Sequence, residues 1–168
     1  GKLIYSSKNI DGSRTDYWKQ DLPHAPYLFM ISVGDYKITK DKWNEKPVWY
    51  YLEEEFTEYA FDIFGNTPEM ISFYSELLDY PYPWEKYSQV VVKDFISGAM
   101  ENTSAAVFFD GMYMTDKELL DRNHEDIIAH ELFHHWFGNL VTCESWSHIL
   151  LNESFATYGE YLWIDHKY

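Results

Sequence analysis

The spacing of apolar residues changes once along this chain, near Leu52, and this change limits the folds open to it. Before that point, short runs of β-branched and aromatic residues alternate with turn residues, a pattern typical of strands. Beyond it, apolar residues recur at intervals of three and four, as on one face of a helix. Strands followed by helices predict an α+β fold. We therefore expect a domain boundary at Leu52, with residues 1–52 in one domain and residues 53–168 in the next.

The predicted elements follow from these two patterns. Gly65 and Gly138 are typical helix ends, and Asn123 is the predicted N-cap of a helix that begins at His124. Strands are predicted at Leu3–Ser6, Thr15–Lys19, Tyr27–Val33, Val48–Leu52, Ser88–Val92 and Ala105–Phe109. Helices are predicted at Phe56–Phe64, at Pro68–Leu78 with Thr67 as its N-cap, at His124–Phe137 and at Ile149–Asp165.

Composition excludes several classes of protein. With 28 acidic and 13 basic residues, the chain has a formal net charge of −15 and lacks the cationic side chains that a nucleic-acid partner requires. The 11 Phe, 7 Trp and 15 Tyr residues are far too many for a disordered segment. The single cysteine, Cys143, excludes a disulfide framework, so any metal must be held by histidine and carboxylate. No apolar run approaches the roughly 20 residues of a membrane span.

The helix predicted from His124 carries the sequence His130-Glu131-Leu132-Phe133-His134. Residues four apart leave the same face of a helix one turn apart, so the two imidazoles can bind a single ion. A catalytic zinc needs a third protein ligand and an open position. Glu153 is the predicted third ligand, because the residues after His134 leave room for a loop and a second helix that returns to the ion.

Several other residues near this motif have predicted roles. Glu131 is the predicted general base, which takes a proton from water activated by the ion. Glu144 and Glu160 are weaker candidates for the third ligand, because one lies in the reversing loop and the other lies farther along the last helix. Thr157 is a candidate hydrogen-bond partner of the ligands, and His135 is expected to pack or to support the site instead of binding metal.

A short stretch, Gly98-Ala99-Met100-Glu101-Asn102, separates two predicted strands. By itself it also fits an ordinary loop with Glu101 in solvent. Beside a zinc site, small residues at Gly98 and Ala99 would leave the backbone open to pair with an extended peptide. Glu101 would then offer a negative charge to the α-ammonium of that peptide, which selects the first peptide bond and predicts an exopeptidase.

The two motifs together resemble the aminopeptidase N family of zinc metallo-aminopeptidases, a gluzincin family that includes the leukotriene hydrolases. The likeness extends through Tyr82–Tyr87, Trp136–Thr142 and Leu151–Ala156, and so covers most of residues 53–168. It implies part of a thermolysin-like zinc metallopeptidase catalytic domain. Residues 1–52 resemble the closing strands of the β-rich N-terminal domain of that family.

The resemblance also implies a function. His130, His134 and Glu153 would bind one zinc ion per chain, and Glu131 would activate water. Glu101 and its neighbours Gly98, Ala99, Met100 and Asn102 would hold a peptide substrate by its free N-terminus. The implied reaction is hydrolysis of the N-terminal peptide bond.

Some features of that family have no match in this chain. His135 stands where the family commonly has Gln, and His148 and Leu150 stand where it often has Asp and Trp. The tyrosine that stabilises the oxyanion lies well downstream of the third ligand in the family, and no residue after Glu153 matches it. We therefore expect a central fragment that binds zinc, has little or no activity alone and needs missing parts of the same polypeptide. Cytoplasmic and exported locations both stay open.

Two alternatives remain from the residues alone. One is a non-catalytic, metal-stabilised interaction domain, and the other is a thermolysin-like endopeptidase. An N-acetylated peptide separates the endopeptidase from an aminopeptidase, because Glu101 would reject a substrate without an ammonium group.

Overall fold

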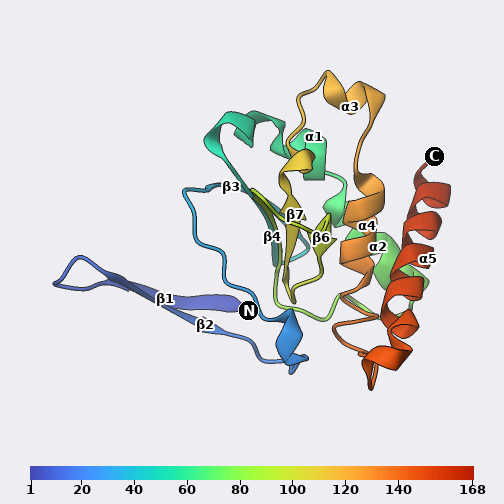
Figure 1. Ribbon diagram of the computed structural model, residues 1–168, viewed down its shortest axis with the longest axis horizontal. Helices are drawn as coiled ribbons and strands as arrows, with labels where there is room; N and C mark the ends of the chain where they lie inside the picture. The colour runs from blue at the N-terminus through green and yellow to red at the C-terminus, as the bar shows by residue number, and fades with distance from the viewer.

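The computed structural model describes residues 1–168, which form two sheets and a group of helices (Figure 1). The strands are β1 Lys2–Lys8, β2 Arg14–Lys19, β3 Lys37–Trp43, β4 Lys46–Leu52, β5 Tyr87–Val92, β6 Ala99–Met100 and β7 Ala105–Phe109. A five-stranded sheet has the order β3-β4-β5-β7-β6, in which β4, β5 and β7 are parallel and the two edge strands are antiparallel to their neighbours. The antiparallel ribbon of β1 and β2 projects away from the rest of the molecule (Figure 1).

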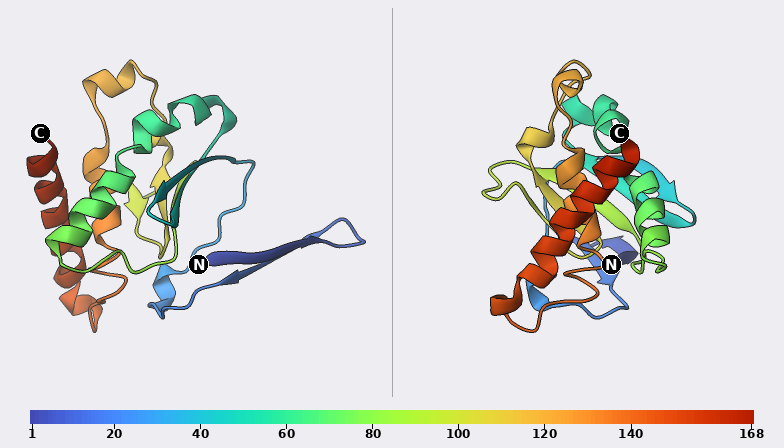
Figure 2. Two further views of the ribbon diagram at one scale, coloured as in Figure 1. Left: turned by 180° about the vertical axis from the view of Figure 1, so that it is seen from behind. Right: turned by 90° about the vertical axis from the view of Figure 1, so that its right-hand side faces the viewer.

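The longer helices gather on one side of the five-stranded sheet, as both figures of the whole molecule show (Figures 1 and 2). The α-helices are α1 Ala60–Phe64, α2 Thr67–Leu77, α3 Glu118–Asp121, α4 Glu125–Phe133 and α5 Leu150–Lys167. Short 3₁₀ helices lie at Pro26–Leu28, Glu54–Tyr59, Asp110–Met112 and Trp146–His148. The predicted α+β class is confirmed. None of these helices has the length and apolar character needed to cross a bilayer.

Helices α4 and α5 are in direct contact at Gly159, which has no side chain to separate them. A Cβ atom on Gly159 would lie only 2.5 Å from Cγ of Phe133 in α4. The Tyr74 hydroxyl donates to the Gly159 carbonyl over 2.9 Å, and Trp163 Nε1 donates to Glu125 Oε2 over 2.9 Å. Because Tyr74 lies in α2 and Glu125 in α4, these contacts fix the rotation of α5 against both helices, and thereby the direction in which α5 presents its polar residues.

One predicted strand is absent from the structure, and two observed strands, β3 and β6, were not predicted. The predicted strand Tyr27–Val33 is a 3₁₀ turn followed by irregular chain. Its backbone pairs with a loop instead of a strand: the Leu28 carbonyl accepts a hydrogen bond from Thr103 N over 3.3 Å. Strand β3 was not predicted, since its alternation is masked by three lysines and its residues are all exposed or partly exposed. Lysines are typical of edge strands, which they protect from further pairing.

The five-stranded sheet continues across the predicted domain boundary. Strand β4 ends at Leu52 and pairs in parallel with β5, with Val48 opposite Tyr87. A division between residues 1–52 and 53–168 therefore separates two neighbouring strands of one sheet. Only the ribbon of β1 and β2 stands apart from that sheet.

Candidate metal centre

Helix α4 carries the two histidines of the H-E-x-x-H sequence at its carboxyl end. The helix ends at Phe133 instead of Phe137, and His124, not Asn123, occupies its N-cap position without a side-chain cap. His134 is the C-cap and keeps helical dihedral angles, so its ring lies on the same side as that of His130. The Nε2 atoms of His130 and His134 are 3.0 Å apart.

Hydrogen bonds fix the tautomer of both rings. His130 Nδ1 lies 2.5 Å from Glu160 Oε1, and His134 Nδ1 lies 3.0 Å from the Phe137 carbonyl. A carboxylate and a carbonyl only accept, so each Nδ1 carries a proton, and each Nε2 has a free lone pair when its ring is neutral, the form that binds a metal ion. Glu160 thus supports His130 from its far side, a role that the sequence assigned to Thr157. Thr157 itself is exposed.

Glu153 completes the group from the first turn of α5. Its Oε2 lies 3.3 Å from His130 Nε2 and 3.5 Å from His134 Nε2. The ligand atoms of the three residues all lie within 4.8 Å of one another. Two imidazole nitrogens and one carboxylate oxygen are the donor set of many catalytic zinc sites.

The electrostatics of the group favour a cation. Burial acts to lower the pKa of His130, but Glu153, Glu131 and Glu160 outweigh it and raise that pKa to about 9. The pKa of His134 is also raised, because hydrogen bonding to Glu153 and nearby carboxylates outweigh its burial. Hydrogen bonds to the two imidazoles hold the pKa of Glu153 well below its usual range. Positive charge is therefore stabilised at the point that the three side chains face.

Two further carboxylates, those of Glu101 and Glu131, are buried beside His134. An oxygen of each and a ring nitrogen of His134 lie within 4.8 Å of one another. Oε2 of Glu131 is buried and has no hydrogen-bond partner, and burial raises the pKa of Glu131 to about 8. A buried polar atom without a partner costs free energy. The Glu131 carboxylate is therefore suited to take a proton or a hydrogen bond from a small molecule bound at the site.

The stretch from Gly98 to Asn102 leads directly to this group. Ala99 and Met100 form β6, which pairs with β7 on one side and leaves its other edge without a strand. Gly98 is exposed before it, while Glu101 and Asn102 are buried after it. The structure thus places Glu101 beside the histidines and next to a free strand edge.

Two residues hold this stretch and the loop after it: Asn139, which sequence reasoning missed, and His135, which it expected to pack or to support the site without naming its partner. Asn139 Nδ2 donates to the Glu101 carbonyl over 2.8 Å, and Ser104 N donates to His135 Nε2 over 3.0 Å. His135 is fully buried, which lowers its pKa to about 3. The one available signal was a titratable residue directly after the H-E-x-x-H sequence, in a run of apolar neighbours.

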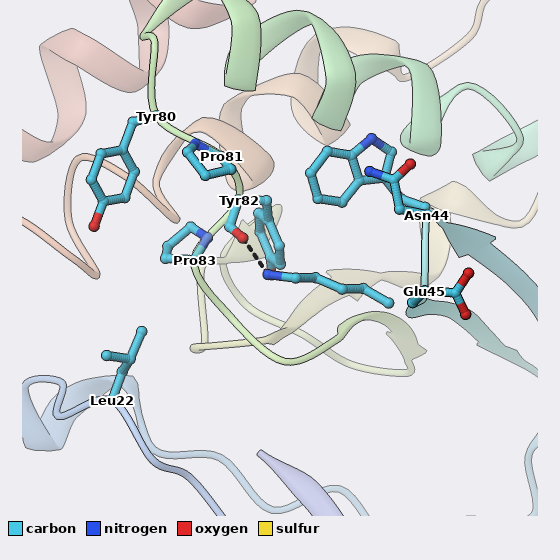
Figure 3. Close-up of a pocket in the computed structure, with 9 residues that line it drawn as sticks. Leu22, Asn44, Glu45, Tyr80, Pro81, Tyr82 and Pro83 are labelled. Carbon is cyan, nitrogen blue, oxygen red and sulfur yellow. Dashed lines mark hydrogen bonds between the residues drawn. The ribbon is translucent and has the colours of Figure 1, made fainter.

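A cavity of about 680 Å³ lies elsewhere, between the β3–β4 turn and the segment Tyr80–Pro83 (Figure 3). Lys46 is one of the lining residues, and its Nζ donates to the Tyr82 carbonyl and lies 5.5 Å from the Tyr82 ring centroid. Its lining includes no histidine, cysteine or paired carboxylates. The cavity therefore has no group of possible metal ligands like the one around His134.

The chain is similar in sequence to known proteins over most of its length. Residues 59–168 match the Peptidase family M1 domain. Over 171 residues the chain is 37% identical to Aminopeptidase N of Streptomyces lividans, covering 95% of this chain and 20% of that protein. Aminopeptidase M1-C of Oryza sativa subsp. japonica is 40% identical over 160 residues, covering 90% of this chain and 18% of that protein. Glutamyl aminopeptidase of Sus scrofa is 31% identical over 164 residues, with coverages of 90% and 17%. The chain spans about a fifth of the length of these curated relatives.

Proposed function

Because the chain belongs to peptidase family M1, we propose that it carries the metal centre and the amine-binding loop of a zinc-dependent aminopeptidase. Its relatives are named aminopeptidases. The observation that carries the proposal is the convergence of His130, His134 and Glu153 beside the two buried carboxylates of Glu101 and Glu131. The fold we propose is part of a thermolysin-like catalytic domain. The ribbon of β1 and β2 would belong to a preceding β-rich domain.

One Zn²⁺ per chain fits the donor set. His130 and His134 would bind it through Nε2, and Glu153 through a carboxylate oxygen. The bonds from the Nδ1 atoms to Glu160 and to the Phe137 carbonyl would hold both rings in the binding orientation. When bound, zinc supplies Lewis acidity, which polarises a substrate carbonyl and makes water more acidic.

Glu131 would carry the proton of the reaction. Its partnerless Oε2 is free to accept a proton from the attacking water, and its raised pKa makes the carboxylate a stronger base than an exposed one. The protonated Glu131 would then pass that proton to the amine that leaves. Burial of the residue keeps bulk water from competing for it.

Glu101 and β6 would bind the substrate. An extended peptide can add to the free edge of β6 through backbone hydrogen bonds, alongside Gly98, Ala99 and Met100. Its α-ammonium would then meet the carboxylate of Glu101, with Asn102 helping to shape the end of the strand. Because Glu101 lies next to Glu131, only the first peptide bond would reach the catalytic group.

The rest of the polypeptide is part of this proposal. These residues span about a fifth of the length of the relatives. We expect residues 1–168 alone to bind zinc and to turn over substrate weakly or not at all, since an absent oxyanion donor costs about 10²–10³ in rate. The partners we propose are a peptide with a free N-terminus and the remaining parts of the same polypeptide.

The test uses the whole natural polypeptide that carries these residues. We expect it to release the chromophore from an aminoacyl chromogenic amide, to lose that activity on chelation and to regain it with zinc. The N-acetylated amide should not be hydrolysed. Equal hydrolysis of both amides would instead identify an endopeptidase, and a folded protein that binds zinc without hydrolysing either would identify an interaction domain.

A further inference from the structure

The loop of residues 101–104, which joins β6 to β7, is buried and bonded to other segments, although it lies at the edge of the sheet. Strand β6 has only two residues and pairs with β7 alone. All four loop residues are nevertheless buried, and Ser104 has a φ of +63°. A left-handed conformation is costly for a residue other than glycine, so contacts around the loop must stabilise it.

Side chains from other segments bond to both ends of this loop. At its first residue, Asn139 Nδ2 donates to the Glu101 carbonyl over 2.8 Å. At its last residue, Ser104 N donates to His135 Nε2 over 3.0 Å, and Lys86 Nζ donates to the Ser104 carbonyl over 2.9 Å. Two of the three anchors, His135 and Asn139, lie in the segment directly after α4.

The rigid ring of His135 makes hydrogen bonds to two segments of the backbone, one through each ring nitrogen. Because Ser104 N–H is a donor, Nε2 of His135 must be the acceptor, and the ring proton is then on Nδ1. Nδ1 donates to the Glu131 carbonyl over 3.0 Å. The ring is fully buried and stands edge-on to Tyr87, with centroids 4.9 Å apart. Ser104 is therefore tied to the turn of helix that carries Glu131.

We propose that His135 and Asn139 are positioning residues, which fix the carboxylate of Glu101 relative to Glu131 and thereby set the affinity for a free α-ammonium. The inference rests on the proposed aminopeptidase function. Neither residue needs to touch the substrate: each acts through the backbone of the loop that carries Glu101. A displacement of about 1 Å in such a group can change rate or binding roughly 100-fold.

The test compares four variants of the whole polypeptide. His135→Leu removes the bond to Ser104 N, whereas His135→Gln keeps an amide oxygen that can accept it. Asn139→Leu removes the donor to Glu101 at similar size. Tyr50→Phe is the control, because it removes a partly buried bond to Asp41 in the sheet, far from the loop in sequence, and leaves the loop anchors intact.

The readouts are zinc content, KM and kcat for the aminoacyl amide, and calorimetric affinity for a dipeptide against its N-acetylated form. In His135→Leu and Asn139→Leu, we expect KM to rise and dipeptide affinity to fall roughly 10- to 100-fold, with one zinc per chain and unchanged binding of the N-acetylated form. His135→Gln and Tyr50→Phe should stay close to the parent.

The outcomes separate this inference from the proposed function. A parent with no preference for the free amine would overturn both. A parent that prefers the free amine, with Leu variants that keep the same preference, would overturn the positioning role alone. Equal loss in His135→Gln and His135→Leu would also contradict it, because the bond to Ser104 N would then be irrelevant. If His135→Leu does not fold, Asn139→Leu tests the same role through the other end of the loop.

Discussion

At the scale of single residues, the two ring nitrogens of His130 have different partners. Nδ1 is bound to Glu160, and Nε2 faces His134 and Glu153. A carboxylate on the far nitrogen orients the ring and makes the other nitrogen a better ligand. Metal affinity should therefore depend on Glu160, although we do not assign it as a ligand.

This dependence is measurable. Glu160→Leu should weaken zinc binding about 10- to 100-fold, because His130 loses the acceptor that orients it. Glu160→Gln, which keeps an accepting oxygen, should lose less. Competition with a chromophoric chelator gives both affinities. Unchanged affinity in Glu160→Leu would show that the ring needs no support from α5.

Glu131 should behave differently from the three proposed ligands. Glu131→Gln keeps the size of the side chain but removes the base, so hydrolysis should fall at least 10²- to 10⁴-fold while zinc content is unchanged. The measurement is kcat for the aminoacyl amide together with metal analysis of the same sample. Residual activity close to that of the parent would exclude Glu131 as the proton carrier.

The sequence predicted that His130 and His134, two of the proposed ligands, would face the same point, because helical spacing decides the direction of their side chains. It did not predict the bonds of His135 and Asn139. Their partners, Ser104 N and the Glu101 carbonyl, are backbone atoms of a distant loop. Every residue type has these backbone atoms, so the sequence does not show which of them accept or donate a side-chain bond.

At the scale of elements, the position of Glu153 depends on how α5 packs against α4. Gly159 permits the close approach, since a Cβ there would lie 2.5 Å from Phe133. Glycine inside a helix is otherwise unfavourable relative to alanine by roughly 0.5–1 kcal/mol. Close packing therefore explains why α5 has a glycine at this place.

Enlarging this residue should displace α5. Gly159→Val should destabilise the protein by about 1–3 kcal/mol, because the added methyl groups overlap the Phe133 ring. It should also weaken zinc binding, because Glu153 moves with the helix. Thr157→Val is the matched control, since Thr157 is exposed on the same helix. Thermal unfolding and chelator competition test both effects, and a Gly159→Val protein with parental zinc affinity would contradict this role of the helix contact.

Elements were predicted well where one face is buried and poorly where pairing is decided at a distance. The run at Tyr27–Val33 is apolar enough for a strand, yet Phe29, Ile31 and Val33 are exposed and only Leu28 is buried. The parallel pairing of β4 with β5, and of β5 with β7, joins segments that are separated in sequence, which apolar spacing does not encode.

At the scale of the whole molecule, a buried cation makes stability depend on pH. Burial lowers the pKa of Lys86 to about 8, whereas the unfolded chain has the ordinary value of about 10.4. Between these values the unfolded state binds more protons than the folded state. Lys86 should therefore contribute a rise in the free energy of unfolding with pH, from about 8 to about 10.4, of up to about 3 kcal/mol.

A variant isolates this contribution. Lys86→Met removes the titrating group, so its free energy of unfolding should lack the rise that the parent shows across this range. Urea denaturation of both proteins at fixed zinc concentration, at pH 7.5, 9 and 10.5, gives the difference. Parallel pH profiles would mean that Lys86 titrates alike in both states.

The proposed function as a whole requires that His130, His134 and Glu153 together hold a zinc ion. The most direct measurement is zinc content and zinc K-edge absorption of the natural polypeptide, compared with His134→Ala. We predict one zinc per chain bound by two imidazole nitrogens and a carboxylate oxygen, and loss of that ion in the variant. A folded protein that binds no zinc, or that keeps it without His134, would contradict this metal centre.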